Sequence, residues 1–292
     1  MVANNYIEEQ TERRSIMLLK GKLFALITIC IISMTLIFAA IPANANAAEE
    51  DGDIAINAQN FPDKAFRKYV SKKIDSDKDG ILTQKELSSV KRISLKGKKI
   101  VSLKGIEHFT NLQKLSCEDN KIKSLDVSKN EKLTLLDVDN NRLKKLNVSS
   151  NVILKKLSCD DNKLTALNVR KNTKLTDLDC SSCKIKSLDL TKNTLLKKLD
   201  CGNNKLKKLN ISKNRKLTVV ECHINKLTKL NITKNTKLKK LKCFRNDIHI
   251  LNAKKQKAGF VVKAPSNTIV QRRGLWVEQR RTQKTKTLKK IQ

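Results

Sequence analysis

The sequence contains few aromatic residues, few histidines and few acidic side chains. Phe, Tyr and Trp together make up 3% of its 292 residues, whereas a large globular core usually contains more of them. The composition therefore argues against a conventional globular core. The three histidines, His108, His223 and His249, stand in no H-E-x-x-H or triad-like setting, and each is interpreted as a solvated residue. The sequence accordingly predicts a protein that is not an enzyme.

Acidic residues are far outnumbered by basic ones. The chain has 28 Asp and Glu residues against 62 Lys and Arg residues, which gives a formal net charge of +34. This excess predicts attraction to anionic polymers such as nucleic acid, wall polymers or lipid headgroups. Charge alone does not choose among them.

The amino-terminal segment indicates the cellular compartment. Two lysines precede an apolar run over residues 23–41, and a stretch of small residues follows it. This order is typical of a secretory signal peptide, here residues 1–47, with cleavage after Ala45 or Ala47. An uncleaved membrane anchor is the alternative, because the run approaches the ~20 residues that span a bilayer. Both alternatives place the remainder outside the cell, which argues against intracellular nucleic acid as a partner. Met17 begins a more typical short signal, so the true start codon is left open.

A 21-residue repeat dominates the middle of the chain. Its first leucine recurs at Leu112, Leu133, Leu154, Leu175, Leu196, Leu217 and Leu238. Each unit follows the pattern L-x-x-L-x-L-x-x-N/C-x-L, as in the unit with Leu154, Leu157, Cys159 and Asn162. One coil cannot bury its own apolar side, whereas stacked coils bury a continuous column of leucines. The repeat therefore predicts a stack of coils.

This pattern resembles the leucine-rich-repeat family, in broad plan the bacterial secreted proteins of internalin type. The resemblance implies an α/β leucine-rich-repeat solenoid over residues 93–252, built mostly from short parallel strands in 21-residue coils. Alternation in Leu-x-Cys points both side chains inward, and the following Asn is expected to bond backbone groups of the bend and form a ladder. About ten residues per half coil leave little room for a helix averaging ~11 residues. The opposite wall is therefore expected to be short strand or turn.

Seven cysteines follow the signal segment, and five of them replace a core aliphatic residue at the same register. These five are Cys159, Cys180, Cys201, Cys222 and Cys243. Side chains at equivalent positions of parallel strands ~4.8 Å apart run side by side rather than toward each other. The positions therefore predict buried thiols that pack as small hydrophobes. Disulfides or a metal site are the alternative.

Residues 75–86 fit the loop pattern D-x-[DN]-x-[DN]-G-x5-E at every fixed position and resemble the EF-hand family there. The resemblance implies calcium as a structural cofactor, held by Asp75, Asp77, Asp79, Ile81 (through its carbonyl), Thr83 and Glu86. We find no second such loop, so weak affinity of ~10⁻⁴–10⁻³ M is expected, typical of extracellular modules. An acidic turn without metal is the alternative. Residues 48–92 are expected to form a small helical cap over the end of the solenoid.

Acidic residues concentrate at strand positions that face solvent. The predicted ligand-binding residues are Asp137, Asp139, Asp160, Asp179, Asp200 and Glu221. Because solenoids bind partners through extended concave surfaces, these residues predict a site for a cationic or hydroxyl-rich extracellular protein or glycan. A solvated surface that keeps the solenoid soluble is the alternative.

The repeat ends near residue 252, and residues 253–292 are predicted to form a carboxyl-terminal cap and a basic tail. No L-P-x-T-G sequence and no late apolar segment follow, so sortase anchoring is not expected. Taken together, the sequence predicts a monomeric, secreted or cell-surface binding protein. A structural cell-wall-associated protein, held to an anionic wall polymer by charge and without a discrete ligand, is the alternative.

Overall fold

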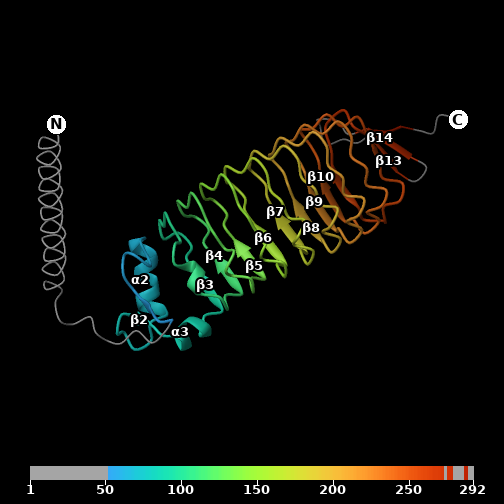
Figure 1. Cartoon of the computed structure of the whole chain (residues 1–292). Coiled ribbons are helices and arrows are strands. Elements are labelled where there is room, and N and C mark those ends of the chain that lie inside the picture. Colours follow the sequence, from blue (N-terminus) through green and yellow to red (C-terminus); the bar gives the residue numbers. More distant parts are fainter. Residues whose placement is uncertain (1–51, 273–274, 279–285, 289–292) are drawn as a thin grey trace, which may run out of the picture. The chain divides into compact units, whose positions relative to one another are not determined.

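The computed structural model of the protein describes residues 52–272, 275–278 and 286–288 (Figure 1). The predicted signal peptide, residues 1–47, lies outside the described residues. Within the described ranges, no helix combines the length and the apolar character needed to cross a membrane. The described chain forms a small amino-terminal cap followed by a solenoid of short coils (Figure 1).

The cap contains two short helices and a two-stranded antiparallel sheet. Its elements are β1 (Ile54–Ala55), α2 (Lys64–Lys73), β2 (Ile81–Leu82) and α3 (Gln84–Ser89). Helix α2 begins after Asp63, whose carboxylate accepts hydrogen bonds from the backbone N–H groups of Ala65 and Phe66 at 2.9 and 3.1 Å, a favoured capping arrangement. Phe66 and Val70 of this helix are buried. The other carboxylate oxygen of Asp63 accepts from the N–H of Val101 at 2.8 Å, which attaches the cap to the first coil.

Nine short strands form one parallel sheet along the solenoid, in the order β12-β10-β9-β8-β7-β6-β5-β4-β3. They are β3 (Arg92–Ser94), β4 (Lys114–Ser116), β5 (Leu135–Asp137), β6 (Lys156–Ser158), β7 (Asp177–Asp179), β8 (Lys198–Asp200), β9 (Val219–Glu221), β10 (Lys240–Lys242) and β12 (Val261–Lys263). The central residue of each strand is buried, while the residues on either side face solvent. Leu136, Leu157 and Leu178 pair directly from coil to coil. The parallel-strand solenoid with 21-residue coils predicted from the repeat is therefore confirmed.

The first asparagine column of the repeat forms the expected ladder. Its members are Asn120, Asn141, Asn162, Asn204, Asn225 and Asn246, with Cys183 in the remaining coil. The side-chain oxygen of Asn162 accepts from the N–H of Leu143 at 2.9 Å, and its amide nitrogen donates to the carbonyl of Val138 at 2.9 Å. Each side chain thus joins its own bend to the preceding coils. Cys183 instead makes a long contact of 3.5 Å from its sulfur to the Cys159 carbonyl.

A second asparagine ladder, which the sequence analysis did not identify, runs along the opposite turn of the coils. Its members are Asn130, Asn151, Asn172, Asn193, Asn214 and Asn235, and Gln256 takes the next position. The amide nitrogen of Asn172 donates to the carbonyls of Val148 and Asn151 at 2.8 and 2.9 Å. These six asparagines are fully buried, so the two ladders hold both ends of every coil in register.

Threonine alternates with lysine where the chain enters the strands. The hydroxyls of Thr134, Thr176 and Thr218 donate to the carbonyls of the preceding coils at 3.1, 3.1 and 3.0 Å. Lys155 and Lys197 occupy the same position in the coils between them. The structural repeat is therefore a pair of coils, or 42 residues, at this position.

The opposite wall consists of turns and short pairings, as expected, with one short 3-10 helix, η1 (Ile106–His108), in the first coil. At the carboxyl-terminal end a four-stranded sheet has the order β11-β13-β14-β15. Its strands are β11 (Ile250–Asn252), β13 (Ile269–Arg272), β14 (Leu275–Glu278) and β15 (Lys286–Leu288). The parallel sheet continues beyond residue 252, because β12 pairs with β10. Phe260, Val262 and Ala264 supply buried side chains there without the leucine pattern.

All seven cysteines of the described residues are free and buried, which confirms the prediction of buried thiols. They are Cys117, Cys159, Cys180, Cys183, Cys201, Cys222 and Cys243. Burial raises the pKa of every one of these thiols, for Cys243 to about 12. The thiols therefore remain protonated and unreactive as nucleophiles.

Candidate functional site

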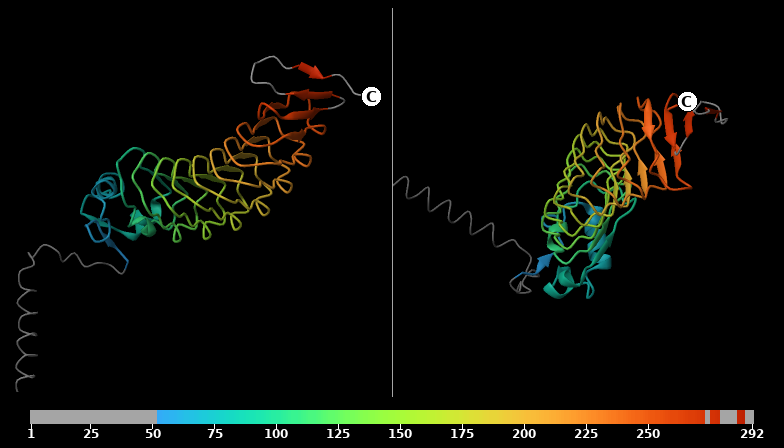
Figure 2. Two further views of the ribbon diagram at one scale, coloured as in Figure 1. Left: turned by 90° about the horizontal axis from the view of Figure 1, so that it is seen from above. Right: turned by 90° about the vertical axis from the view of Figure 1, so that its right-hand side faces the viewer.

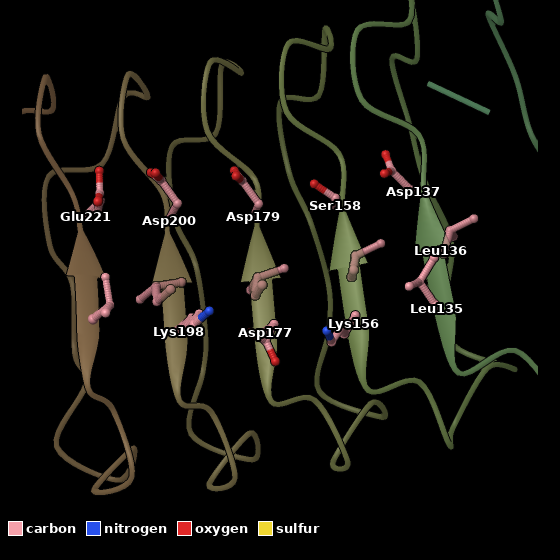
Figure 3. A pocket seen from close by; sticks show the side chains of 14 residues that line it. Leu135, Leu136, Asp137, Lys156, Ser158, Asp177, Asp179, Lys198, Asp200 and Glu221 are labelled. Atoms are coloured by element: carbon pink, nitrogen blue, oxygen red, sulfur yellow. The ribbon is translucent and has the colours of Figure 1, made fainter. Parts of the chain in front are cut away.

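The solvent-facing side of strands β5 to β9 contains a shallow groove of about 340 Å³ (Figure 3). Five carboxylates line it: Asp137, Asp177, Asp179, Asp200 and Glu221. Pairing of the strands places the last residue of each strand in one row, so that Asp179 lies directly beside Asp200, and Asp200 beside Glu221. Ser158 interrupts the row between Asp137 and Asp179. We call Asp137, Ser158, Asp179, Asp200 and Glu221 the acidic row.

A second row, formed by the first residue of each strand, lies along the other side of the groove. Lys156, Asp177 and Lys198 follow one another in it. Figure 3 shows these side chains at the opposite ends of the strands from the acidic row. The lysines of the groove therefore do not form ion pairs with the acidic row across the strand.

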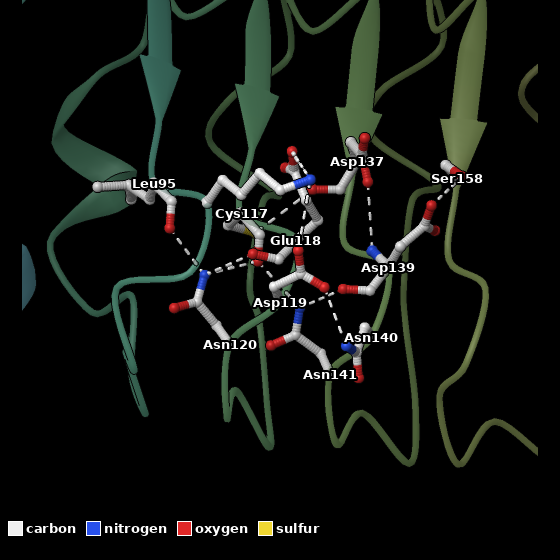
Figure 4. Close-up of polar contacts among 11 residues, drawn as sticks. Leu95, Cys117, Glu118, Asp119, Asn120, Asp137, Asp139, Asn140, Asn141 and Ser158 are labelled. Atoms are coloured by element: carbon white, nitrogen blue, oxygen red, sulfur yellow. Dashed lines mark hydrogen bonds and ion pairs between the residues drawn. The ribbon is translucent and has the colours of Figure 1, made fainter.

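Four of the six predicted ligand-binding residues lie in the acidic row, and two do not. Asp139 and Asp160 lie in the bend that follows the strands (Figure 4). Asp139 accepts hydrogen bonds from the hydroxyl of Ser158 at 2.8 Å and from the N–H of Asp160 at 2.7 Å. The Asp160 carboxylate accepts from the hydroxyl of Ser181 at 2.7 Å. These two aspartates therefore support the edge of the groove and do not line it.

The acidic row is only partly neutralised by neighbouring cations. Glu221 forms ion pairs with Lys240 at 3.0 Å and Lys242 at 2.6 Å. Although burial favours its neutral form, hydrogen bonds from these two lysines outweigh burial and lower the pKa of Glu221. Among the ion pairs of the described residues, none involves Asp137, Asp179 or Asp200.

Burial raises the pKa of the unpaired carboxyls. The pKa of Asp137 and Asp179 is raised mainly by burial. For Asp200 burial acts together with the charges of Asp179 and Glu221 and raises the pKa to about 6. In the adjacent bend, burial also raises the pKa of Asp139 to about 6. The groove therefore holds negative charge that is unfavourable for the folded protein at neutral pH.

Acidification from about pH 8 to about pH 5 is expected to raise the melting temperature. A carboxyl whose pKa rises from 3.8 to about 6 on folding takes up a proton as the chain folds, so its contribution to stability increases as the pH falls through 6. His223 acts in the opposite direction, because burial lowers its pKa. The double variant Asp139→Asn, Asp200→Asn retains this histidine effect and should lose the stabilisation. Thermal denaturation at both pH values measures the difference, and an unchanged rise in the double variant would contradict this assignment.

His223 is more structured than the sequence analysis expected. Its ring stacks on Phe244 with 4.9 Å between ring centroids and 22° between planes. The other face of the ring lies over Gly202, where an added Cβ would approach the imidazole Cε1 to 2.5 Å. The interpretation of His223 as a simply solvated residue is therefore wrong, because a glycine one coil earlier makes room for its ring. The aromatic residue one coil later was the available signal.

The EF-hand-like loop brings three predicted ligands together. Oxygen atoms of Asp75, Asp77 and Glu86 lie within 4.8 Å of one another, and Asp75 and Glu86 are buried. Asp79 lies outside this cluster, and its carboxylate accepts from the N–H of Ile81 at 2.7 Å. The other strand residue of the loop pairs with Ile54. A set of carboxylate oxygens suits a hard divalent cation, so the residues present fit calcium.

Glu86 has a structural role as well. Its carboxylate accepts hydrogen bonds from the N–H and hydroxyl of Ser76, both at 2.6 Å. It also accepts from the N–H of Thr83 at 3.0 Å, which completes a capping box at the start of α3. Burial of Glu86 opposes ionisation, but the hydrogen bonds from Ser76 and Thr83 outweigh burial and lower its pKa. By contrast, burial raises the pKa of Asp75. Glu86 is therefore held ionised in the position that would close a cation's ligand shell.

Comparison with known proteins gave matches among solved structures, while no protein-family model and no curated protein sequence matched. An internalin C2 of Listeria monocytogenes is 22% identical over 73% of this chain and 97% of that chain, with a TM-score of 0.65. An internalin of the same organism, inlF, is 20% identical over 74% of this chain and 72% of that chain, with a TM-score of 0.58. These two similarities show that the chain has the leucine-rich-repeat solenoid fold of internalins.

The functional domain of InlJ from Listeria monocytogenes, described as including a cysteine ladder, also matches. It is 26% identical over 74% of this chain, with a TM-score of 0.41. This chain covers 63% of that chain, which is less than two thirds of its length.

Proposed function

We propose that this protein is a secreted or cell-surface binding protein whose acidic row captures a protein or glycan that carries cationic groups. The observation that supports this proposal is the set of carboxylates at Asp137, Asp179 and Asp200, which lack ion-pair partners among the described residues. The chain has 62 Lys and Arg residues against 28 acidic ones, so unpaired carboxylates gathered in one groove are unexpected on composition alone. Strongly perturbed groups gather at functional sites more often than elsewhere.

A cationic partner would relieve the unfavourable charge of the groove. The carboxyls of Asp139 and Asp200 have pKa values near 6, so the folded protein at neutral pH holds them ionised at a cost in free energy. An ammonium or guanidinium group that pairs with Asp179 and Asp200 would offset this cost, and hydrogen bonds of this type are about twice as strong as neutral ones. The shape of the groove supports the same proposal, because solenoids use their extended strand faces for binding.

A binding role suits the acidic row better than a catalytic one. Its carboxylates repeat from coil to coil at the same strand position, and no pair stands apart with an acid and a base in distinct roles. We therefore propose a protein without enzymatic activity that acts as a monomer.

The proposed function is tested by removing the three unpaired charges together. The variant Asp137→Asn, Asp179→Asn, Asp200→Asn should lose at least tenfold in affinity for ligands found by screening the protein against arrays of extracellular proteins and glycans, since each lost charge-assisted bond contributes about 1.5–3 kcal/mol. Biolayer interferometry on each array hit measures the loss.

The matched control is Asp126→Asn, Glu131→Gln, Asp161→Asn, which changes the net charge equally at exposed positions outside the groove. This control should retain full binding. If the groove variant still binds every partner of the unchanged protein, the acidic row is a solvated surface and the proposal is wrong. That outcome would favour a structural wall protein without a discrete ligand.

We also propose that calcium binds the EF-hand-like loop and stabilises the cap. The clustered oxygens of Asp75, Asp77 and Glu86 support this proposal, as does the attachment of the loop to β1, which holds the second half of the loop in place. The proposed role is structural, because the cap contacts the first coil through Asp63.

A further inference from the structure

Basic side chains form a continuous line along the edge of the solenoid where each coil leaves the first asparagine ladder. We call this line the cation row; its members are Lys121, Arg142, Lys163, Lys184, Lys205 and Lys226. All six side chains are exposed. The row lies outside the groove described above.

Backbone hydrogen bonds hold the cation row in register. The N–H of Arg142 donates to the carbonyl of Ile122 at 2.9 Å, and the N–H of Lys163 donates to the carbonyl of Leu143 at 2.8 Å. The other members of the row make the same bond to the preceding coil at 2.8 to 2.9 Å. Neighbouring members are therefore separated by about one strand spacing, ~4.8 Å, and the row extends over roughly 24 Å.

Further lysines broaden the row without any opposing charge. The five-residue segments that begin at the six members contain thirteen basic residues and no acidic residue. They are residues 121–125, 142–146, 163–167, 184–188, 205–209 and 226–230. Among the ion pairs of the described residues, none involves these segments.

This arrangement does not serve stability. Like charges at directly opposed positions of neighbouring strands are destabilising, and a scattered distribution of the same lysines would keep the protein equally soluble. A linear anion laid along the row would reverse the sign of the interaction and release counterions from the polymer. The row therefore has the geometry of a contact surface for a polymer that runs parallel to the solenoid axis.

The residue types and the shape of the solenoid specify the polymer further. Twelve of the thirteen cations are lysines, which act as flexible point charges and do not recognise a fixed ligand geometry as arginine does. The solenoid also bends along its length (Figure 2), so a straight, stiff duplex with a persistence length of ~500 Å meets fewer members of the row than a flexible chain.

We propose that the cation row binds a flexible, linear phosphodiester polymer, with one phosphate contact per coil. This inference deepens the predicted attachment to an anionic wall polymer and does not depend on the acidic row. Six contacts correspond to a slope of about −4 in a plot of log K against log salt concentration, at about 0.7 per contact for a single-stranded polyanion.

The test uses fluorescently labelled poly(glycerol phosphate), with binding measured by fluorescence anisotropy over a range of salt concentrations. The variant Lys163→Gln, Lys184→Gln, Lys205→Gln should make the slope shallower by about 2 and weaken binding roughly fifty-fold at ~0.15 M salt, since it removes three contacts. Its melting temperature should not fall, because the three side chains are exposed.

A matched control removes three other exposed lysines on the same three consecutive coils. The variant Lys171→Gln, Lys192→Gln, Lys213→Gln changes the net charge equally, in a row that Ser150 interrupts, and should leave the slope nearly unchanged. Equal losses in the two variants would show diffuse attraction to a basic protein and overturn the proposal. Tighter binding of duplex DNA than of poly(glycerol phosphate) at equal phosphate concentration would also overturn it. Loss of polymer binding with intact binding by the acidic row, or the reverse, separates this inference from the proposed function.

Discussion

Replacement of Asn162 by alanine is expected to destabilise the solenoid by about 3–5 kcal/mol, because each buried polar group left without a partner costs about 1–3 kcal/mol. Asn162 is buried. Its side-chain oxygen accepts from Leu143, and its amide nitrogen donates to the carbonyls of Val138, Cys159 and Asp160 at 2.9 to 3.2 Å. Alanine removes all of these bonds, and water does not reach the groups left behind. Urea denaturation followed by circular dichroism measures the loss.

The next coil provides a companion variant with the opposite sign. Cys183 occupies the same column but does not reproduce the asparagine bonds, and its thiol lies near the N–H groups of Asn162 and Leu164. The substitution Cys183→Asn should complete the ladder and raise the free energy of unfolding by about 1 kcal/mol, the net value of a typical buried hydrogen bond. A ladder that matters for stability requires both signs. A neutral result for Asn162→Ala would show that the column is dispensable.

Calcium is expected to stabilise the protein, and the substitution Glu86→Gln should abolish this response. At about 10 mM calcium and a Kd of ~10⁻⁴–10⁻³ M, binding to the folded state alone adds roughly 1.4–2.7 kcal/mol. Glutamine retains the capping-box geometry at Thr83, so the variant removes the charged ligand with little effect on α3. Thermal denaturation with calcium and with a chelator measures the response.

Two controls accompany the calcium experiment. Glu107→Gln removes one carboxylate outside the loop and should keep the full response. Magnesium demands stricter octahedral geometry than calcium, so it should stabilise the protein less than calcium at the same concentration. If the unchanged protein and the Glu86→Gln variant respond equally, calcium does not bind through the loop.

The sequence predicted the solenoid well because the period is chemical as well as numerical. Leu157 and Cys159 alternate on the inward side of one short strand, and the same types return 21 residues later at Leu178 and Cys180. A stack of identical coils converts this period directly into strand register, so the row that contains Asp179 and its neighbours followed from the spacing.

The remaining features depend on local backbone geometry and on packing between coils. Asp139 was assigned to the ligand face, but the chain has already entered the bend there, and Asn140 has a positive φ of 49°. The second ladder was visible as an asparagine every 21 residues from Asn130 onward, yet its role depends on burial that composition does not reveal. The coil that includes β12 (Val261–Lys263) has no leucine signature, because the existing stack provides the surface against which it packs.

The alternation of threonine and lysine has a consequence for how such a chain can change its length over evolutionary time. Removal of residues 155–196 would join Leu154 to Lys197 and present every remaining coil with the neighbour type that it has now. The molecule would shorten by two strand spacings, roughly 10 Å. Loss of a single coil would instead set two coils of the same type against each other. The gene can therefore lengthen or shorten this protein most smoothly in even steps, which makes its reach a quantised, heritable quantity.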